Sequence, residues 1–155
     1  MSTNINEIRY RLIVRQAEDQ QLNQLIPKIR KLLDDFFVKE NDRTKWGLKS
    51  TQLSNLLGVS GETDSSEVVI GFIEYQIGRD KRYENWAWEG FGEKMKGELR
   101  ALQEVSKGIV GKAIQDSHYS FDENIRALEI QKVWIELVRL YAGYLRRYFV
   151  YKKGE

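Results

Sequence analysis

The segment LNQLIPKIRKLLDDFF, residues 22–37, repeats apolar side chains at the spacing of an amphipathic α-helix. The apolar positions follow i, i+3, i+4 and i+7: Leu22, Leu25, Ile26, Ile29, Leu32, Leu33, Phe36 and Phe37. A helix places such residues on one face, which is buried against other elements. Pro27 lies inside the pattern, so we expect it either to kink the helix or to occupy its first turn.

Two short helices are predicted after this segment. Residues 50–58 begin with Ser and Thr and end at Gly58, as a helix with an N-cap and a glycine C-cap does. Asp64 with Glu67 has the spacing of a capping box, so we expect the next helix to start there and to end at Gly78. The expected buried residues of the two helices are Leu53, Leu56 and Leu57, then Val68, Val69, Phe72, Ile73 and Ile77.

Two long helices are predicted in the second half of the chain. The first carries an apolar stripe at Phe91, Met95, Leu99, Leu102, Val105 and Ile109. Ser120 with Glu123 has capping-box spacing and opens the last helix. The expected apolar face of that helix is Ile125, Leu128, Val133, Trp134, Leu137, Val138, Tyr141, Leu145 and Tyr148. No segment alternates as a β-sheet does, so we predict an all-α fold, a compact bundle of about five helices.

The chain of 155 residues suits a single helical-bundle domain over residues 1–155. Residues 7–16 fit either a short strand or an additional helical turn, and residues 1–17 form a segment that can be flexible. No apolar run approaches the ~18 residues of a membrane span, and the N-terminus lacks an apolar signal core. We therefore expect a cytoplasmic protein that does not engage a membrane.

The distribution of charge and the absence of catalytic or metal-binding motifs limit the classes of function that the chain can have. The formal net charge is only +2, yet Lys and Arg outnumber Asp and Glu in residues 28–49 and 139–155, so local basic patches are possible. The chain has no Cys and a single His, His118, in a polar turn. No Glu-x-x-His pair, phosphate-binding glycine loop or G-x-S-x-G motif is present. We expect no catalytic residue, no metal and no cofactor.

The aromatic and basic residues of the chain allow alternative interpretations. Arg146, Arg147, Lys152 and Lys153 near the C-terminus form a secondary candidate basic patch for nucleic acid. They equally fit the usual excess of cations in the last turns of a helix, where they complement its dipole. Residues 86–88, WAW, fit either a core anchor at a helix start or an exposed aromatic patch for a partner.

Two neighbouring segments carry a resemblance to a known family. LKSTQLSNLL, residues 48–57, is followed after a short turn by VVIGFIEYQIGRD, residues 68–80. Together they resemble the small helical subunit of type III CRISPR effector complexes. The matching residues are Thr51, Gln52, Leu53, Tyr75, Gly78 and Arg79. The chain departs from the family at Ser54 and Asn55, where a basic residue is common.

The resemblance implies a non-catalytic structural subunit. Several copies would stack with one another and with other subunits, and would line the channel that holds guide RNA and target RNA. If the two short helices pack antiparallel, their cations converge on one edge and can contact backbone phosphates. The candidate nucleic-acid-binding residues are Lys45, Lys49, Gln52, Arg79, Lys81 and Arg82.

Three alternatives remain at this point. The same cations can instead pair with Asp42, Asp80 and Glu84 on the surface, where each pair contributes roughly 0–1 kcal/mol. The chain can also be a helical protein–protein adaptor or oligomeric scaffold without an RNA role. A small helical enzyme with dispersed catalytic residues is the third alternative.

Overall fold

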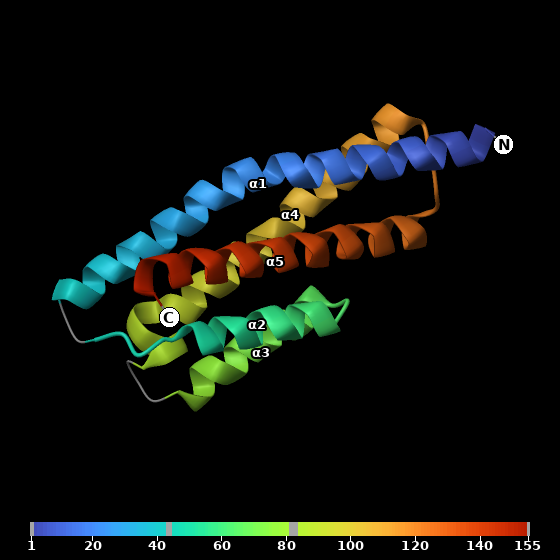
Figure 1. Ribbon diagram of the computed structural model, residues 1–155. Coiled ribbons are helices and arrows are strands. Elements are labelled where there is room, and N and C mark those ends of the chain that lie inside the picture. The colour runs from blue at the N-terminus through green and yellow to red at the C-terminus, as the bar shows by residue number, and fades with distance from the viewer. Residues whose placement is uncertain (1, 43–44, 81–83, 155) are drawn as a thin grey trace.

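The computed structural model describes residues 2–42, 45–80 and 84–154, and over these ranges the protein is an all-α bundle without β-strands. The elements are α1 (Ser2–Asp42), α2 (Ser50–Glu62), α3 (Ser66–Arg79), the 3₁₀ helix η1 (Asn85–Gly90), α4 (Phe91–Ser117) and α5 (Glu123–Lys153). In Figure 1, α1 and α5 run side by side in the same direction and α4 runs the opposite way. The α2–α3 hairpin packs against α4 and α5.

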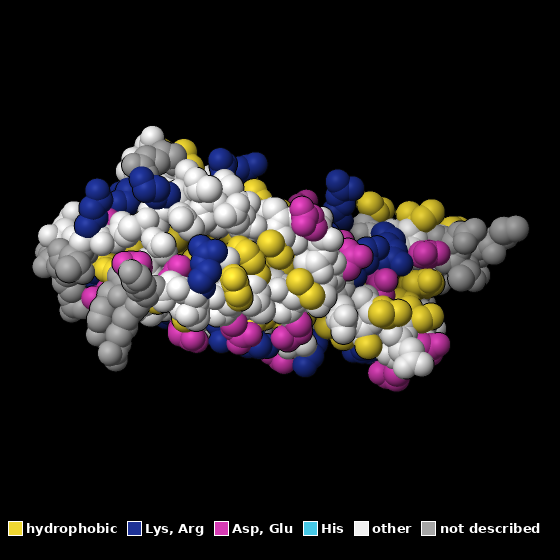
Figure 2. Space-filling view, turned by 90° about the horizontal axis from the view of Figure 1, so that it is seen from below, with side chains coloured by type: hydrophobic (Ala, Val, Ile, Leu, Met, Phe, Trp, Pro, Cys, Tyr) yellow, Lys and Arg dark blue, Asp and Glu magenta, His cyan; other side chains and the backbone are white. Residues whose placement is uncertain are grey.

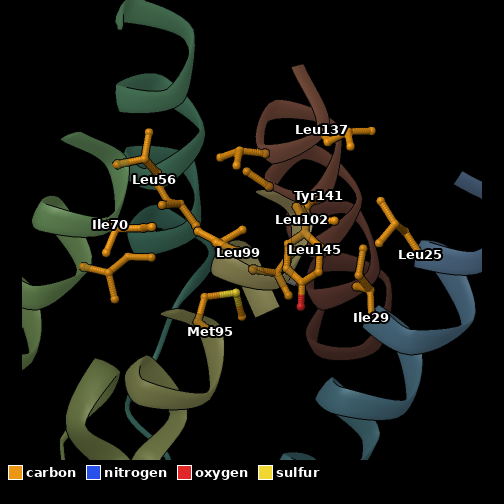
Figure 3. Close-up of a cluster of buried hydrophobic side chains, with 14 of the residues drawn as sticks. Leu25, Ile29, Leu56, Ile70, Met95, Leu99, Leu102, Leu137, Tyr141 and Leu145 are labelled. Atoms are coloured by element: carbon orange, nitrogen blue, oxygen red, sulfur yellow. The ribbon is translucent and has the colours of Figure 1, made fainter. Parts of the chain in front are cut away.

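The core draws side chains from all five α-helices. Figure 3 shows Ile29 of α1, Leu56 of α2, Ile70 of α3 and Leu99 of α4 converging on Leu145 of α5. All five are 0–1% exposed. Because α5 contacts every other α-helix, its apolar face holds the bundle together. The prediction of a helical bundle from periodicity is confirmed.

An aromatic cluster closes one end of this core. The rings of Trp46 and Trp88 stack with centroids 5.4 Å apart and planes 16° apart, and Phe91 meets Trp46 edge-on at 4.8 Å. Trp46 also donates a 3.0 Å hydrogen bond from its indole N–H to the carbonyl of Asn85. Trp86 and Trp88 are each 1% exposed. Residues 86–88 are therefore a core anchor, and the alternative of an exposed aromatic patch is wrong.

Three expected breakpoints lie inside helices. α1 continues through Pro27, so the interpretation of Pro27 as the first turn is wrong, and residues 7–16 are helical rather than extended. α2 passes Gly58 and ends at Glu62, and α3 includes Gly78 and ends at Arg79. Helix propensity is a weak effect of about 1 kcal/mol for glycine, and packing of the buried faces outweighs it.

The N-caps of α3 and α5 also differ from the predicted ones. Ser65, not Asp64, accepts the hydrogen bond from the Val68 N–H. Asp122, not Ser120, caps α5 by accepting from the Ile125 N–H at 2.9 Å. Several cap-forming residues lie side by side in both loops, so the spacing of the motif did not identify the one with the required extended backbone.

Two predicted apolar faces are partly solvent-exposed. Val68 on α3 is 52% exposed, and Ile125 and Leu128 at the start of α5 are 45% and 65% exposed. The face that α3 buries includes Ile70, which was not among the expected residues, together with Val69 and Ile73. The buried face of α3 therefore lies slightly further around the helix than the face that the sequence predicted.

Candidate nucleic-acid interface

The antiparallel α2–α3 hairpin brings part of the predicted binding residues to one end of the molecule. The start of α2 and the end of α3 lie at the same end of the pair (Figure 1). Lys45 and Lys49 precede α2, and Arg79 lies in the last turn of α3. All three side chains are exposed. Lys81 and Arg82, the other two predicted cations, lie outside the described residues.

These three cations are free of acidic partners within the described part of the chain. None of Lys45, Lys49 and Arg79 forms an ion pair with a described residue. The Asp80 carboxylate accepts a 2.9 Å hydrogen bond from the Trp86 N–H and forms no ion pair with Arg79. Among the described residues the Arg79 guanidinium therefore has no carboxylate partner, and the helix includes Gly78 before it.

Gln52 has a structural role at this end. Its side-chain oxygen accepts a 2.7 Å hydrogen bond from the Lys49 N–H, and the Gln52 N–H donates to the Lys49 carbonyl at 3.0 Å. These two hydrogen bonds stabilise the first turn of α2, and Gln52 takes the place that a glutamine has in a capping box. Its amide oxygen is therefore engaged within the protein, which the sequence did not reveal.

The secondary C-terminal patch does not form one free basic surface. Arg146 donates a 2.6 Å hydrogen bond to the Ser54 hydroxyl, Lys152 lies 3.7 Å from the Asp34 carboxylate, and Lys153 is paired with Glu40. Arg147 differs from these three. It is exposed and forms no ion pair with a described residue, and its guanidinium lies 5.1 Å from the centroid of the Tyr144 ring.

A groove between α1 and the C-terminal part of α5 surrounds Arg147. We call it the tyrosine–arginine groove; its volume is about 520 Å³ and its lining residues are Ile26, Ile29, Arg30, Tyr144, Arg147, Tyr148 and Tyr151. This groove was not among the sites predicted from the sequence. A signal was present, because Tyr144, Arg147, Tyr148 and Tyr151 follow i, i+3, i+4 and i+7 and so share one helix face.

The rings and cations of this groove are held by specific contacts. Tyr148 donates a 2.8 Å hydrogen bond to Asp34, and the Arg30 guanidinium lies 5.8 Å from the Tyr148 ring centroid. Partial burial and the Asp34 carboxylate raise the pKa of the Tyr148 hydroxyl, so it stays protonated. Tyr151 lies 6.0 Å from Tyr148, ring to ring, and is 80% exposed.

The face of the molecule seen from below carries both charge and apolar surface. Figure 2 shows a hydrophobic patch across its middle, Lys and Arg side chains on both sides of it, and Asp and Glu with some Lys and Arg along the lower edge. Val68 and Tyr75, the exposed hydrophobic residues of α3, are 52% and 63% exposed. Uncovered apolar surface of this kind is typical of a contact surface for other chains.

Comparisons with protein-family models, with curated proteins and with solved structures found no match for the chain. Over residues 2–42, 45–80 and 84–154, no three His, Asp or Glu side chains gather closely enough to hold a metal ion. No helix in those ranges combines the length and the apolar character needed to cross a membrane.

Proposed function

We propose that this protein is a non-catalytic RNA-binding structural subunit that contacts backbone phosphates through the hairpin end, defined as Lys45, Lys49 and Arg79. The observation that supports this best is that three exposed cations without a carboxylate partner among the described residues lie at the same end of the α2–α3 hairpin. Some cations elsewhere on the surface are engaged with carboxylates, for example Arg100 with Glu67 and Lys107 with Glu104.

Unpaired cations matter because phosphate binding is largely electrostatic. A cation already paired with a carboxylate must break that pair to bind a phosphate, whereas a free one releases only water and counterions. Contacts to phosphates carry no sequence information, so the protein would bind different RNA sequences with similar affinity.

The resemblance at residues 48–80 makes the proposal more specific. The subunit would belong to a type III CRISPR effector complex in the cytoplasm, and would contact guide RNA and target RNA. Neighbouring copies of the chain and other subunits would be its protein partners. The motif residues Tyr75 and Gly78 lie on the last turns of α3, which end at Arg79 of the hairpin end.

The test is a double charge reversal at the hairpin end. Lys49→Glu with Arg79→Glu should weaken target-RNA binding by the assembled complex and by the isolated chain. It should also lower the salt dependence, by about 0.7 per lost contact for single-stranded RNA. The matched control is Arg9→Glu with Lys112→Glu, which makes the same change in net charge at two exposed positions. Arg9 belongs to the N-terminal part of α1 and Lys112 to the C-terminal part of α4, and both parts lie at the opposite end of the molecule (Figure 1). Equal effects of the two double variants would contradict the proposal.

A second candidate function is a protein–protein adaptor without an RNA role. The observation that favours it is the apolar outer face of α1, where Ile5, Ile8 and Leu12 are 55–60% exposed. Co-purification from the source cells separates the two functions. RNA of defined length retained with the chain supports the subunit, and stable protein partners without RNA support the adaptor.

A further inference from the structure

The tyrosine–arginine groove combines an exposed aromatic ring with guanidinium groups, and the core needs neither for its packing. Tyr151 is the most exposed of the large hydrophobic side chains in the described residues, at 80%, and so contributes little to folding. Arg30 and Arg147 line opposite walls, one on α1 and one on α5, and neither forms an ion pair with a described residue. Packing within the protein therefore does not explain these side chains.

The geometry of the groove fits a flat, anionic ligand. Each guanidinium lies near a tyrosine ring, Arg147 at 5.1 Å from Tyr144 and Arg30 at 5.8 Å from Tyr148. Such cation–π contacts hold the guanidinium groups while their outer N–H donors stay available. The volume of about 520 Å³ lies within the range of about 300–1,000 Å³ that is usual for small-molecule sites.

The exposed ring of Tyr151 supplies a stacking surface beside these donors. Tyr148, whose hydroxyl is fixed by Asp34, and Tyr151 have planes 35° apart, so a planar group entering the groove can lie against one ring and touch the other. Aromatic rings that stack bases, next to cations that bind the backbone, are the pattern of single-stranded nucleic-acid binding.

We propose that the tyrosine–arginine groove binds one unpaired nucleotide of a single-stranded RNA, with the base against Tyr151 and Tyr148 and its phosphate between Arg30 and Arg147. The inference rests on the proposed function in one respect, namely that the chain meets RNA. It adds a second contact of a different kind. The hairpin end binds the backbone of any RNA, whereas the groove requires a base that is not stacked in a duplex.

The experiment measures binding of the full-length chain to a single-stranded oligoribonucleotide that carries one 2-aminopurine base. Stacking of this base on a tyrosine ring quenches its fluorescence. Tyr151→Leu removes the ring and keeps an apolar side chain, and Tyr151→Trp keeps a stacking surface. Leu128→Ala, an exposed apolar change at the other end of α5, is the control.

We expect Tyr151→Leu to weaken binding roughly tenfold, or about 1.4 kcal/mol, because the base loses the ring on which it stacks. The salt dependence should stay unchanged, the quenching should be lost, and Tyr151→Trp should retain both affinity and quenching. Arg147→Ala should lower the salt slope by about 0.7, and Arg9→Ala should not. Fully duplex RNA should bind the Tyr151→Leu variant and the unaltered chain equally.

The outcomes separate this inference from the proposed function. If Tyr151→Leu matches the unaltered chain while the Lys49→Glu and Arg79→Glu changes weaken binding, the groove is not a nucleotide site and the hairpin end stands. The reverse pattern supports the groove and overturns the hairpin end. No quenching by the unaltered chain also overturns the inference.

Discussion

Glu18 of α1 faces Glu136 of α5 across the interface between the two helices. Glu18 is 8% exposed, and its Oε2 atom has no hydrogen-bond donor. Two ionised carboxylates are both acceptors, so a proton between them is needed to form a hydrogen bond. Burial, and then the contact with Glu136, raise the pKa of Glu18 to about 9, although Lys132 opposes the shift.

This pair predicts that stability depends on pH. The folded protein binds the Glu18 proton more tightly than the unfolded chain, whose glutamates titrate near ~4.3. The stabilisation of the folded state by the Glu18 proton is therefore complete below pH ~4.3. It is lost as the pH rises toward about 9. We expect the free energy of unfolding, measured with urea, to fall over this window by at most about 1.4 kcal/mol per pH unit. Glu18→Gln should flatten the fall, and the exposed Glu104→Gln should not.

Gly92 is the position on α4 where a side chain does not fit. A Cβ atom there would lie 2.5 Å from Ile77 Cγ1 and 2.8 Å from the Trp86 carbonyl oxygen. Since the backbone carbonyl cannot rotate away, Gly92→Ala should destabilise the protein by about 1–3 kcal/mol. Gly97→Ala on the same helix has open space around it and should stabilise by about 0.5–1 kcal/mol. Thermal unfolding compares the two; a stabilising Gly92→Ala would mean that α3 and α4 pack less closely than described.

The cap of α5 provides a direct test of the position of its first turn. Asp122→Ala removes the acceptor of the Ile125 N–H and should cost about 1 kcal/mol. Ser120→Ala, at the residue that the capping-box spacing favoured, should change the free energy of unfolding by less than about 0.5 kcal/mol. Denaturant unfolding of both variants is the measurement, and a larger loss for Ser120→Ala would place the start of α5 earlier.

Two substitutions at Gln52 test stability and RNA binding independently. Gln52→Ala removes the bond to the Lys49 N–H and should destabilise the protein by about 1 kcal/mol. Gln52→Glu keeps an acceptor at the helix N-terminus, where a negative charge is favourable, so the stability should be retained. The added charge beside Lys49 should nevertheless weaken RNA binding. Unfolding curves and RNA titrations at one salt concentration measure the two effects, and unaltered RNA affinity in Gln52→Glu would place the RNA elsewhere.

Helical periodicity alone determined the class of fold and much of the core. The stripe from Phe91 to Leu102 is buried as expected, and so is the face of α5 from Val133 to Leu145. This succeeds because a repeat of about 3.6 residues is a local property, and a helix that long has to bury its apolar face. The antiparallel packing of α2 and α3 was only assumed as a condition for the predicted binding residues to meet, and the structure shows it.

Only the tertiary structure decided which polar groups are free and which are engaged. Arg146 and Lys153 look like Arg147 in the sequence, yet Arg146 bonds to Ser54 and Lys153 pairs with Glu40. Arg147 has no ion pair with a described residue and lies beside the Tyr144 ring. The tyrosine–arginine groove likewise exists only because α1 and α5, at opposite ends of the chain, lie side by side. Such contacts depend on the distance between side chains from remote segments, and the local pattern of residues does not contain that distance.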